Sequence, residues 1–470
     1  MADFEMIVIG SGPAGEKAAA QAAYFGHRVA IVERHPAPGG VPVHFGGIPS
    51  KTLREAANYL TGFRLRDIYG LGLGLAPDLL LDRLRAREAE VEATMTEAVA
   101  RNIERHGIEL IQGHATLGPG QAVTVAEADD KTRILTTDVI LIATGSSPLR
   151  PGAIPFDDPD VHDSDSILGI DRIPDSLVVI GGGPVGSEYA SIFTALGAQV
   201  TLVDAADRLI PFLDPEISGV LHEAFTAMGM DVHLGSAGAA IERRGDAGGG
   251  GLHVDLGDGA EATPDMVLFA AGRVGNTRGL GLEEAGVEVS ERGLVVVDAH
   301  YRTTAPRVYA AGDVIGPPAL ASVSAEQGRV AACHAFDIPF KEVVDPLPPY
   351  GIYSIPEVGM IGMTEPAAAA AGIDYAVGRA RFADNPKSRI AGTTVGLVKL
   401  VVRRDDHRLL GVHIIGDEAA ELIHHAQAVM HAGDPFDRFI DFTYNIPTRT
   451  EAYKYAAYDT LQNLAAVAGG

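Results

Sequence analysis

The chain has 470 residues, a length that favours two or three domains, and its 46% hydrophobic and 21% charged residues are typical of a folded protein rather than a disordered one. It has 37 lysines and arginines against 62 aspartates and glutamates, and the resulting formal charge of −25 favours neither a nucleic acid nor an anionic membrane as partner. A single cysteine excludes an intrachain disulfide and a zinc–thiolate cluster, and the lack of a long apolar run or a basic leader predicts a soluble cytoplasmic protein.

The first predicted elements are a strand, a glycine-rich turn, a helix and a second strand. A β-branched strand over 7–9 enters the sequence GSGPAG at 10–15, an alanine-rich helix follows, and a strand over 29–32 ends at Glu33. In this pattern the first glycine makes a tight turn, the second admits a pyrophosphate, and the third lets the helix pack on the strand. Free N–H groups at the helix N-terminus attract the pyrophosphate, and the acidic residue accepts hydrogen bonds from ribose hydroxyls. The segment therefore predicts a dinucleotide site.

The same arrangement recurs in the middle of the chain. A strand over 177–180 enters GGGPVG at 181–186, a helix runs to Leu196, and a strand over 200–203 ends at Asp204. The acidic residue follows the first glycine by 23 positions in both copies. Two such sites predict electron transfer between two cofactors. Because two independently bound nicotinamides would serve little purpose, we expect one nucleotide to be a tightly held flavin.

Three further strands are predicted to run into glycine where a nucleotide is expected. They cover residues 139–146, 266–273 and 308–313, and the last of them delivers Asp313 at its carboxyl end, where open α/β sheets bind ligands. Taken singly, each is equally explained as an ordinary turn at a strand end.

Together these segments resemble the flavoprotein pyridine nucleotide-disulfide oxidoreductases over residues 4–465, and within that family they are most similar to the soluble, Si-specific NAD(P)+ transhydrogenases. The similarity is carried by HFGGIPSKTLREA (44–56), VHDSDSIL (161–168), GGGPVGSEYASIF (181–193), YSIPEVGMIGMTE (353–365), IIGDEAAELIHHAQAVM (414–430) and NIPTRTEAYKYAA (445–457). The resemblance implies an α/β fold with two Rossmann-like dinucleotide-binding domains and a C-terminal α+β interface domain that forms a homodimer. The implied domains are a discontinuous FAD domain at 1–150 and 275–345, an NAD(P) domain at 151–274 and an interface domain at 346–470.

The resemblance also implies roles for individual residues. The implied site for a tightly bound, non-covalent FAD consists of Gly10, Gly12, Pro13, Ala14, Gly15, Glu33, Arg34, Gly40, Lys51, Thr144, Gly145, Gly312, Asp313, Leu320 and Ala321. The implied NAD site consists of Gly181, Gly183, Pro184, Val185, Gly186, Glu188, Asp204, Gly272 and Arg273. Lys51 is implied to lie beside the flavin ring and to form a catalytic ion pair with Glu188, although a Lys–Glu pair can also be a surface bridge of little energetic value.

The chain departs from the family where the redox-active cysteines and the catalytic histidine are expected. Pro42 and Gly47 occupy the two cysteine positions, and Ile446 stands where the histidine is expected, five positions before Glu451. Without a thiolate or its base, disulfide exchange at this site is excluded. The expected reaction is hydride transfer from a nicotinamide to flavin N5 and then directly to a second acceptor. We expect the acceptor face to include Pro42, His44, Phe45, Gly47, Ile446 and Glu451.

The identity of the acceptor stays open at this level. A second NAD(P)+ would make the protein a transhydrogenase, with NADP(H) a possible partner. The alternatives are an NADH-dependent diaphorase or quinone reductase, an H2O2-forming oxidase, a flavin oxidoreductase of specialised metabolism, or a flavin-binding scaffold or sensor without turnover. Asp204 is followed by Ala205 and Ala206, and Arg208 is the only cation near it in the sequence, so we expect NADH to be preferred over NADPH.

Three other features are predicted to have no part in the chemistry. Cys333 lies in an apolar helical stretch and is expected to be a buried, inert thiol. His424, His425 and His431 are expected on a helix surface rather than around a metal, and no metal site is predicted. An acidic cluster is interpreted as a solvated linker between domains, and consists of Asp157, Asp158, Asp160, Asp163 and Asp165.

Overall fold

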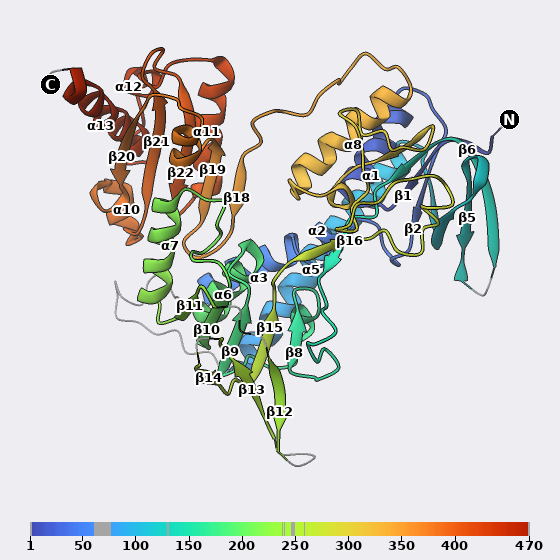
Figure 1. Ribbon diagram of the computed structural model, residues 1–470, viewed down its shortest axis with the longest axis horizontal. Helices are drawn as coiled ribbons and strands as arrows, with labels where there is room; N and C mark the ends of the chain where they lie inside the picture. The colour runs from blue at the N-terminus through green and yellow to red at the C-terminus, as the bar shows by residue number, and fades with distance from the viewer. Residues whose placement is uncertain are drawn as a thin grey trace. The chain divides into compact units, whose positions relative to one another are not determined.

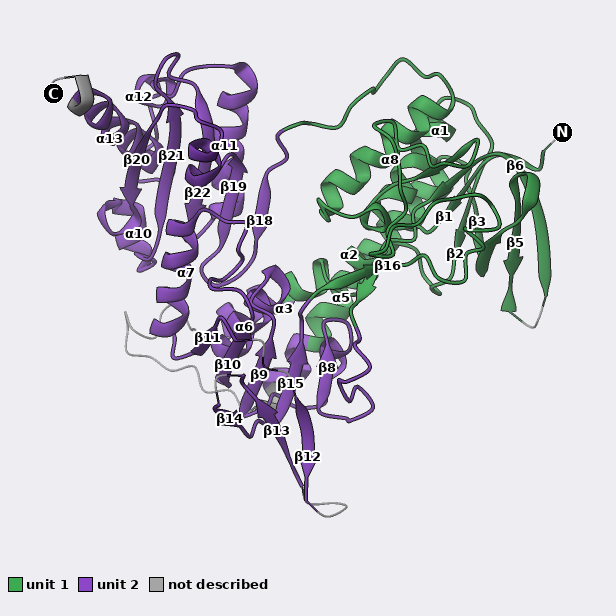
Figure 2. Ribbon diagram, in the orientation of Figure 1, with its two compact units in different colours: residues 1–52, 85–149, 272–346 green, residues 53–84, 150–271, 347–470 purple. Residues whose placement is uncertain are grey.

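A computed structural model (Figure 1) describes residues 2–60, 77–128, 131–236, 238, 240–245, 250–257 and 259–468. The chain divides into two compact units, which Figure 2 shows in green and purple. Unit 1 comprises residues 1–52, 85–149 and 272–346, and unit 2 comprises residues 53–84, 150–271 and 347–470. The division into FAD, NAD(P) and interface domains stays a prediction.

Unit 1 is built on a seven-stranded sheet with the order β3-β2-β1-β6-β5-β4, in which β17 also pairs with β6. The strands are β1 (Phe4–Ile9), β2 (Val29–Glu33), β3 (Glu109–Gln112), β4 (His114–Leu117), β5 (Ala122–Ala126), β6 (Thr132–Ile142) and β17 (Val308–Ala310). The pairings among β3, β2, β1, β6 and β17 are parallel, and β4, β5 and β6 form an antiparallel extension. A separate antiparallel pair joins β7 (Ser146–Pro148) to β16 (Arg273–Gly275).

Helices α1 (Pro13–Tyr24) and α8 (Ala321–Ala335) cover one face of this sheet (Figure 1). Met6 and Val8 of β1 pack with the alanines of these helices, whereas Ile7 and Ile9 face the opposite layer, because successive strand residues point to opposite faces. The remaining helices that begin in unit 1 or enter it are α2 (Val41–His44), α3 (Ile48–Leu60), α5 (Pro77–Arg105), η1 (Pro119–Gln121) and η4 (Asp313–Ile315).

Unit 2 contains a five-stranded parallel sheet with the order β11-β10-β9-β15-β8. Its strands are β8 (Val161–Asp163), β9 (Ser176–Ile180), β10 (Gln199–Asp204), β11 (Asp231–Leu234) and β15 (Met266–Phe269), and its helices are η3 (Ser166–Gly169), α6 (Pro184–Leu196) and α7 (Pro215–Ala227). A small antiparallel sheet of β12 (Ile241–Arg244), β13 (Gly251–Asp255) and β14 (Glu261–Ala262) follows β11 in the chain.

The C-terminal part of unit 2 is an antiparallel sheet with the order β18-β19-β22-β21-β20. Its strands are β18 (Tyr350–Ile352), β19 (Val358–Gly362), β20 (Tyr375–Arg381), β21 (Leu397–Arg403) and β22 (Leu409–Ile415). Its helices are α9 (Glu365–Ala370), η5 (Phe382–Asp384), α10 (Pro386–Ala391), α11 (Ala419–Ala432), α12 (Arg438–Asp441) and α13 (Glu451–Ala468). Leu177 and Leu268 of the parallel sheet share a buried core with Val358 and Ile415 of this sheet.

The interpretation of the acidic cluster as solvated is wrong for Asp158, Asp160 and Asp163, although Asp157 is exposed. Asp163 ends strand β8, its side chain is 2% exposed, and its Oδ2 lies 2.6 Å from Arg150 Nε. Asp158 and Asp160 both pair with the guanidinium of Arg243, at 2.6 and 2.7 Å. Because Arg243 of β12 is about 80 residues away in the chain, composition alone could not reveal that it pairs with the two carboxylates that precede β8.

The expectation of surface histidines holds for His424 and fails for His425. His424 is exposed, whereas the ring of His425 is half-buried among aromatic rings and lies 5.2 Å from that of Tyr453. Burial lowers the pKa of His425, so the neutral ring belongs to the packing of α11 on α13.

Candidate functional site

The turn between β1 and α1 depends on glycines, because the backbone segments in it lie too close together for a side chain. Gly10 has φ of +102°, and a Cβ built on Gly15 would overlap the carbonyl oxygen of Gly10. Gly12 is the N-cap of α1 and, within the described residues, no side chain caps it. The first N–H groups of α1 are therefore oriented as an anion site requires.

Glu33 holds this turn in place. The residue is 8% exposed, and its carboxylate accepts hydrogen bonds from the backbone N–H of Ser11 (2.8 Å), the hydroxyl of Ser11 (2.6 Å) and the backbone N–H of His35 (2.8 Å). Sequence reasoning missed Ser11, whose only signal is a hydroxyl at the variable position directly after the first glycine.

The turn between β9 and α6 repeats this geometry. Gly181 has φ of +113°, and a Cβ built on Gly186 would overlap the Gly181 carbonyl oxygen. Gly183 is the N-cap of α6, also without a side-chain cap among the described residues, and a Cβ built there would meet no atom within 4 Å.

Asp204 occupies the place that Glu33 has in the first turn. Its carboxylate accepts hydrogen bonds from the backbone N–H groups of Gly182 and Ala206, the latter at 2.6 Å. Arg208 does not bond to Asp204 in the described structure; its Nη2 donates to the carbonyl oxygen of Pro211 at 2.8 Å.

Asp313 and Arg273 are linked through one serine in unit 1. The hydroxyl of Ser146 donates to Asp313 Oδ2 (2.8 Å), and Arg273 donates from Nε to the same hydroxyl (2.9 Å) and from Nη2 to the Ser146 carbonyl (2.8 Å). The predicted NAD-site residue Arg273 thus lies with the predicted FAD-site residue Asp313, and its assignment to the NAD site stays a prediction. Ser146 was missed, since nothing in its sequence context distinguishes it.

The proposed catalytic pair is divided between the two units. Lys51 is half-buried in unit 1, where its Nζ lies 3.4 Å from Ser50 Oγ and 3.5 Å from the Gly46 carbonyl oxygen. Glu188 is 7% exposed in unit 2, and its Oε1 accepts a hydrogen bond from the backbone N–H of Tyr353 at 2.9 Å. The ion pair between Lys51 and Glu188 stays a prediction.

The other predicted nucleotide residues lie in turns or at the ends of helices and strands, and their roles stay predictions. The first turns of α1 and α6 contain Pro13, Ala14, Pro184 and Val185; Arg34 follows β2, Gly40 precedes α2, Thr144 and Gly145 follow β6, Gly272 precedes β16, Gly312 precedes η4, and Leu320 and Ala321 begin α8.

The two positions of the family's cysteines are in direct contact. A Cβ built on Gly47 would lie 2.6 Å from both the Cα and the carbonyl oxygen of Pro42. The space that a second side chain would need is therefore filled by backbone, and a bridging group at residue 47 would require that backbone to move.

His44 is held inside unit 1 rather than on an open face. Its side chain is 3% exposed, with Nδ1 2.8 Å from Glu92 Oε1 and Nε2 3.1 Å from the Pro38 carbonyl oxygen, and its ring packs 4.3 Å from that of His35. Phe45 beside it is half-buried. Both ring nitrogens of His44 are thus engaged, which suits it to fixing α2 rather than to meeting a ligand.

Ile446 and Glu451 lie in unit 2 and differ in exposure. Ile446 is 77% exposed, whereas Glu451 is 6% exposed and accepts a hydrogen bond from the backbone N–H of Thr448 at 3.2 Å. Their part in an acceptor face stays a prediction.

Cys333 is buried in α8, and burial raises the pKa of its thiol, which suits an inert side chain. Across the part of the chain that the structure describes, no group of three histidine, cysteine or acidic side chains could hold a metal ion. No helix in that part is long and apolar enough to cross a membrane.

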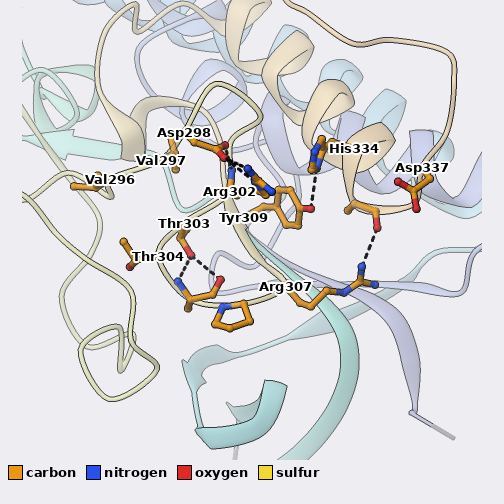
Figure 3. Close-up of a pocket in the computed structure, with 13 residues that line it drawn as sticks. Val296, Val297, Asp298, Arg302, Thr303, Thr304, Arg307, Tyr309, His334 and Asp337 are labelled. Atoms are coloured by element: carbon orange, nitrogen blue, oxygen red, sulfur yellow. Dashed lines mark hydrogen bonds and ion pairs between the residues drawn. The ribbon is translucent and has the colours of Figure 1, made fainter.

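One cavity of about 700 Å³ lies in unit 1 beside the C-terminal end of α8 (Figure 3). The polar groups drawn there bond mainly to one another: Tyr309 to His334 at 3.0 Å, Arg302 to Asp298 at 2.6 Å, and Arg307 to the carbonyl oxygen of Ala335 at 3.2 Å. None of the residues predicted to bind a nucleotide or to form the acceptor face lines this cavity.

Comparisons with known proteins agree with the fold. Residues 4–328 match the family model described as pyridine nucleotide-disulphide oxidoreductase, and residues 348–457 match the dimerisation domain of the same family. Proteins named soluble pyridine nucleotide transhydrogenase are 42% identical in Mycobacterium tuberculosis, over 99% of both chains, and 40% identical in Chromohalobacter salexigens, over 98% of this chain and 99% of the other.

Solved structures of flavoproteins have the same fold as this chain. The HOCl-induced flavoprotein disulfide reductase RclA from Escherichia coli is 27% identical, with a TM-score of 0.86 over 97% of this chain and 99% of that one. LpdA from Mycobacterium tuberculosis is 28% identical, with a TM-score of 0.86 over 96% and 99%. The chain therefore belongs to the pyridine nucleotide-disulphide oxidoreductases, a family of enzymes that depend on a flavin and a pyridine nucleotide, and it does so without the cysteine pair from which that name derives.

Proposed function

We propose that this protein is an FAD-dependent NAD(P)+ transhydrogenase that passes electrons from one nicotinamide to another without a disulfide relay. The observation that carries the proposal is the combination of two nucleotide turns with the contact between Pro42 and Gly47: neither relay position has a thiol, and residue 47 has no room for a side chain. The relatives named soluble pyridine nucleotide transhydrogenase support the choice of acceptor.

The residues of both turns fit a dinucleotide. At each turn the helix begins at a glycine without a side-chain cap among the described residues, so its free N–H groups and dipole favour a pyrophosphate. A carboxylate stands 23 positions after the first glycine of each turn, where it can meet ribose hydroxyls. We assign the first turn, with Asp313, to FAD and the second to the nicotinamide nucleotide.

The bound flavin supplies the redox chemistry, namely acceptance of a hydride from a reduced nicotinamide and its donation to a second acceptor. The protein supplies charge and position. The Lys51 ammonium would stabilise negative charge beside the flavin, and Glu188 would hold that ammonium in place. With no acid–base group needed for a leaving thiolate, Ile446 can replace the histidine at the same position without loss of this reaction.

We further propose that NADH is preferred over NADPH. Asp204 accepts two backbone hydrogen bonds and would repel a 2′-phosphate, while Nε and Nη2 of Arg208 are directed to the carbonyl oxygen of Pro211. We also propose a homodimer, because the family's dimerisation domain is matched over 348–457 and Ile446 in that stretch is 77% exposed. A cytoplasmic location stays a prediction.

A strict preference for NADH would favour a second candidate function. A site that excludes NADP(H) could not exchange electrons between the two coenzymes, and the protein would then be an NADH-dependent diaphorase, quinone reductase or oxidase. A scaffold without turnover is the remaining alternative, and bound FAD that no nicotinamide reduces would favour it.

Anaerobic stopped-flow reduction of the purified flavoprotein, with NADH and NADPH in separate runs, tests the proposal. We expect NADH to bleach the flavin rapidly and NADPH to do so more slowly. Faster reduction by NADPH would contradict the role of Asp204, and a flavin that neither nucleotide bleaches would contradict the proposed function as a whole.

A further inference from the structure

The segment Tyr353–Glu357 of unit 2, which we call the strap, is bonded to helix α6 on one side. The backbone N–H of Tyr353 donates to Oε1 of Glu188 at 2.9 Å, and the backbone N–H of Ile355 donates to Oγ of Ser191 at 3.1 Å. Glu188 and Ser191 are three residues apart and therefore share one face of α6. The strap thus lies along the face that carries the proposed catalytic carboxylate.

On its other side the strap is bonded to helix α3 through Arg54. The guanidinium is 2% exposed, its Nε donates to the carbonyl oxygen of Ser354 at 3.2 Å, and its Nη2 lies 2.8 Å from Glu357 Oε1. Glu357 is 8% exposed, and its second carboxylate oxygen accepts a hydrogen bond from the backbone N–H of Ala420 at 3.4 Å. One buried arginine therefore binds the strap at two points.

These contacts connect Arg54 to the carboxylate of Glu188. A guanidinium is a planar, rigid fork; Nη1 of Arg54 pairs with the exposed Glu55, and its two acceptors on the strap fix the direction of the backbone between them. The carbonyl it binds belongs to Ser354, the residue directly after Tyr353, whose N–H donates to Glu188. Burial of the Tyr353 phenol, together with the carboxylates of Glu357 and Glu188, raises its pKa, so this side chain adds no charge beside the carboxylate.

We propose that Arg54 is a positioning residue for hydride transfer: it acts through the strap, and it fixes the carboxylate of Glu188. The proposal rests on the proposed function, in which Glu188 holds Lys51. Lys51 precedes Arg54 by three residues in α3, so the helix that bears the proposed ammonium also bears the residue that orients its partner.

The main variant is the double substitution Arg54→Gln with Glu357→Gln. It removes both charges together, and so avoids the unpaired buried charge that either single substitution would leave. We expect amide hydrogen exchange at Tyr353 and Ile355 in the FAD-loaded protein to accelerate about tenfold, because the strap loses its attachment to α3 and its N–H groups separate more often from Glu188 and Ser191. We expect the limiting rate of flavin reduction by NADH to fall about tenfold, the size of effect that misplacement by a fraction of an ångström produces.

Two further variants separate positioning from general stability. Lys399→Gln with Asp214→Asn neutralises another buried ion pair of unit 2, at 2.8 Å, in a cluster where Lys399 also pairs with Glu216 and Glu365 and whose described hydrogen bonds and ion pairs involve neither α3, α6 nor the strap. This control should lower the melting temperature and leave both the limiting rate and the exchange at Tyr353 unchanged. Arg54→Lys keeps the charge without the fork and should recover the melting temperature more fully than the rate.

Protected Tyr353 and Ile355 amides together with a wild-type limiting rate in the Arg54→Gln, Glu357→Gln variant would overturn the inference. A rate that falls in parallel with melting temperature in both double variants would also overturn it. If NADH does not bleach the wild-type flavin, the proposed function fails instead, and the exchange measurement still decides whether Arg54 holds the strap.

Discussion

The two glycine turns of this protein share one geometry but differ in how firmly each is closed. In the first, Ser11 connects the turn to Glu33 and also accepts a hydrogen bond from the Gly39 N–H at 3.1 Å. A Cβ built on Gly40 would lie 2.7 Å from the Cα of Gly12, so a second glycine segment closes over this turn. In the second turn a glycine, Gly182, stands in place of the serine.

The second turn is open where the first is closed. A Cβ built on Gly183 would meet no atom within 4 Å, and Asp204 has two backbone donors and is half-buried. A closed, cross-linked turn suits a nucleotide that stays bound, and an open turn suits one that must leave in every cycle. The difference supports assigning FAD to the first turn and the exchanging nicotinamide to the second.

The largest effects should come from filling the space behind the third glycine of each turn. Gly15→Ala and Gly186→Ala each force a methyl group against a carbonyl oxygen, at a cost of about 1–3 kcal/mol that the turn must absorb by moving. We expect Gly15→Ala to purify without flavin, and Gly186→Ala to purify yellow but resist bleaching by NADH. Absorbance of the purified proteins and anaerobic titration check both, and loss of flavin from Gly186→Ala would contradict the assignment.

Glu33 and Asp204, the acidic residues of the two turns, should contribute differently to the free energy of unfolding. In Glu33→Gln the new amide N–H groups face N–H donors in a buried site, and we expect the free energy of unfolding to fall by about 3 kcal/mol. Asp204→Asn should cost about 1 kcal/mol, because water reaches that site. Urea unfolding of the flavin-free proteins measures both values, and equal losses would contradict the contrast between a closed and an open turn.

A smaller effect is expected on the choice of coenzyme. Asp204→Ala removes the charge that repels a 2′-phosphate, and we expect the ratio of kcat/KM for NADPH to that for NADH to rise about tenfold. Steady-state kinetics with both coenzymes measures the ratio. Asp207→Ala is the control, since this charge lies nearby but belongs to neither turn. An unchanged ratio in Asp204→Ala would mean that another residue sets the preference.

The smallest effect is a difference in acid sensitivity between the two units. Asp163 and Asp214 of unit 2 are buried, which opposes ionisation, but hydrogen bonds from Ser166 and Arg150 to the former and from Lys399 to the latter outweigh burial and lower both pKa values. Because these folded-state pKa values are depressed, their stabilisation is present above about pH 4 and is lost as the pH falls through the folded values.

Hydrogen exchange between pH 7 and pH 3 should therefore reveal earlier loss of protection around β8 and the start of α7 than in Met6–Ile9 and Val29–Val32. In unit 1, Met6–Ile9 and Val29–Val32 form a core with little ionisable content. Simultaneous loss of protection in both units would contradict this reading.

Much of the fold and the two turns could be predicted because short-range rules determine them. The spacing of glycines and acidic residues places the β1–α1–β2 and β9–α6–β10 units, and α6 ends at Leu196 as the sequence predicts. The contacts of Arg54 with Ser354 and Glu357 could not be predicted, because they join residues about 300 positions apart and no local pattern indicates that the two segments meet.

The same limit explains the interpretations that the structure changes, such as those of the acidic cluster and His44. From the sequence, the aspartates near residue 160 are interpreted as solvated, because Arg150 and Arg243 become their partners only in the folded chain. From the sequence, His44 is expected to face the electron acceptor, because its partner Glu92 lies 48 positions later in the chain. Local pattern predicts elements and turns, whereas the partner of a charged side chain depends on tertiary packing.

The most direct test of the central claim is the return of electrons from the reduced flavin to a second nicotinamide. The protein would be bleached anaerobically with one equivalent of NADH and then mixed with thio-NAD+, while flavin and thio-NADH absorbance are followed together. We predict that the yellow colour returns with one thio-NADH formed per flavin. A flavin that stays bleached until a quinone or oxygen is added would contradict the claim and identify the protein as a diaphorase or oxidase.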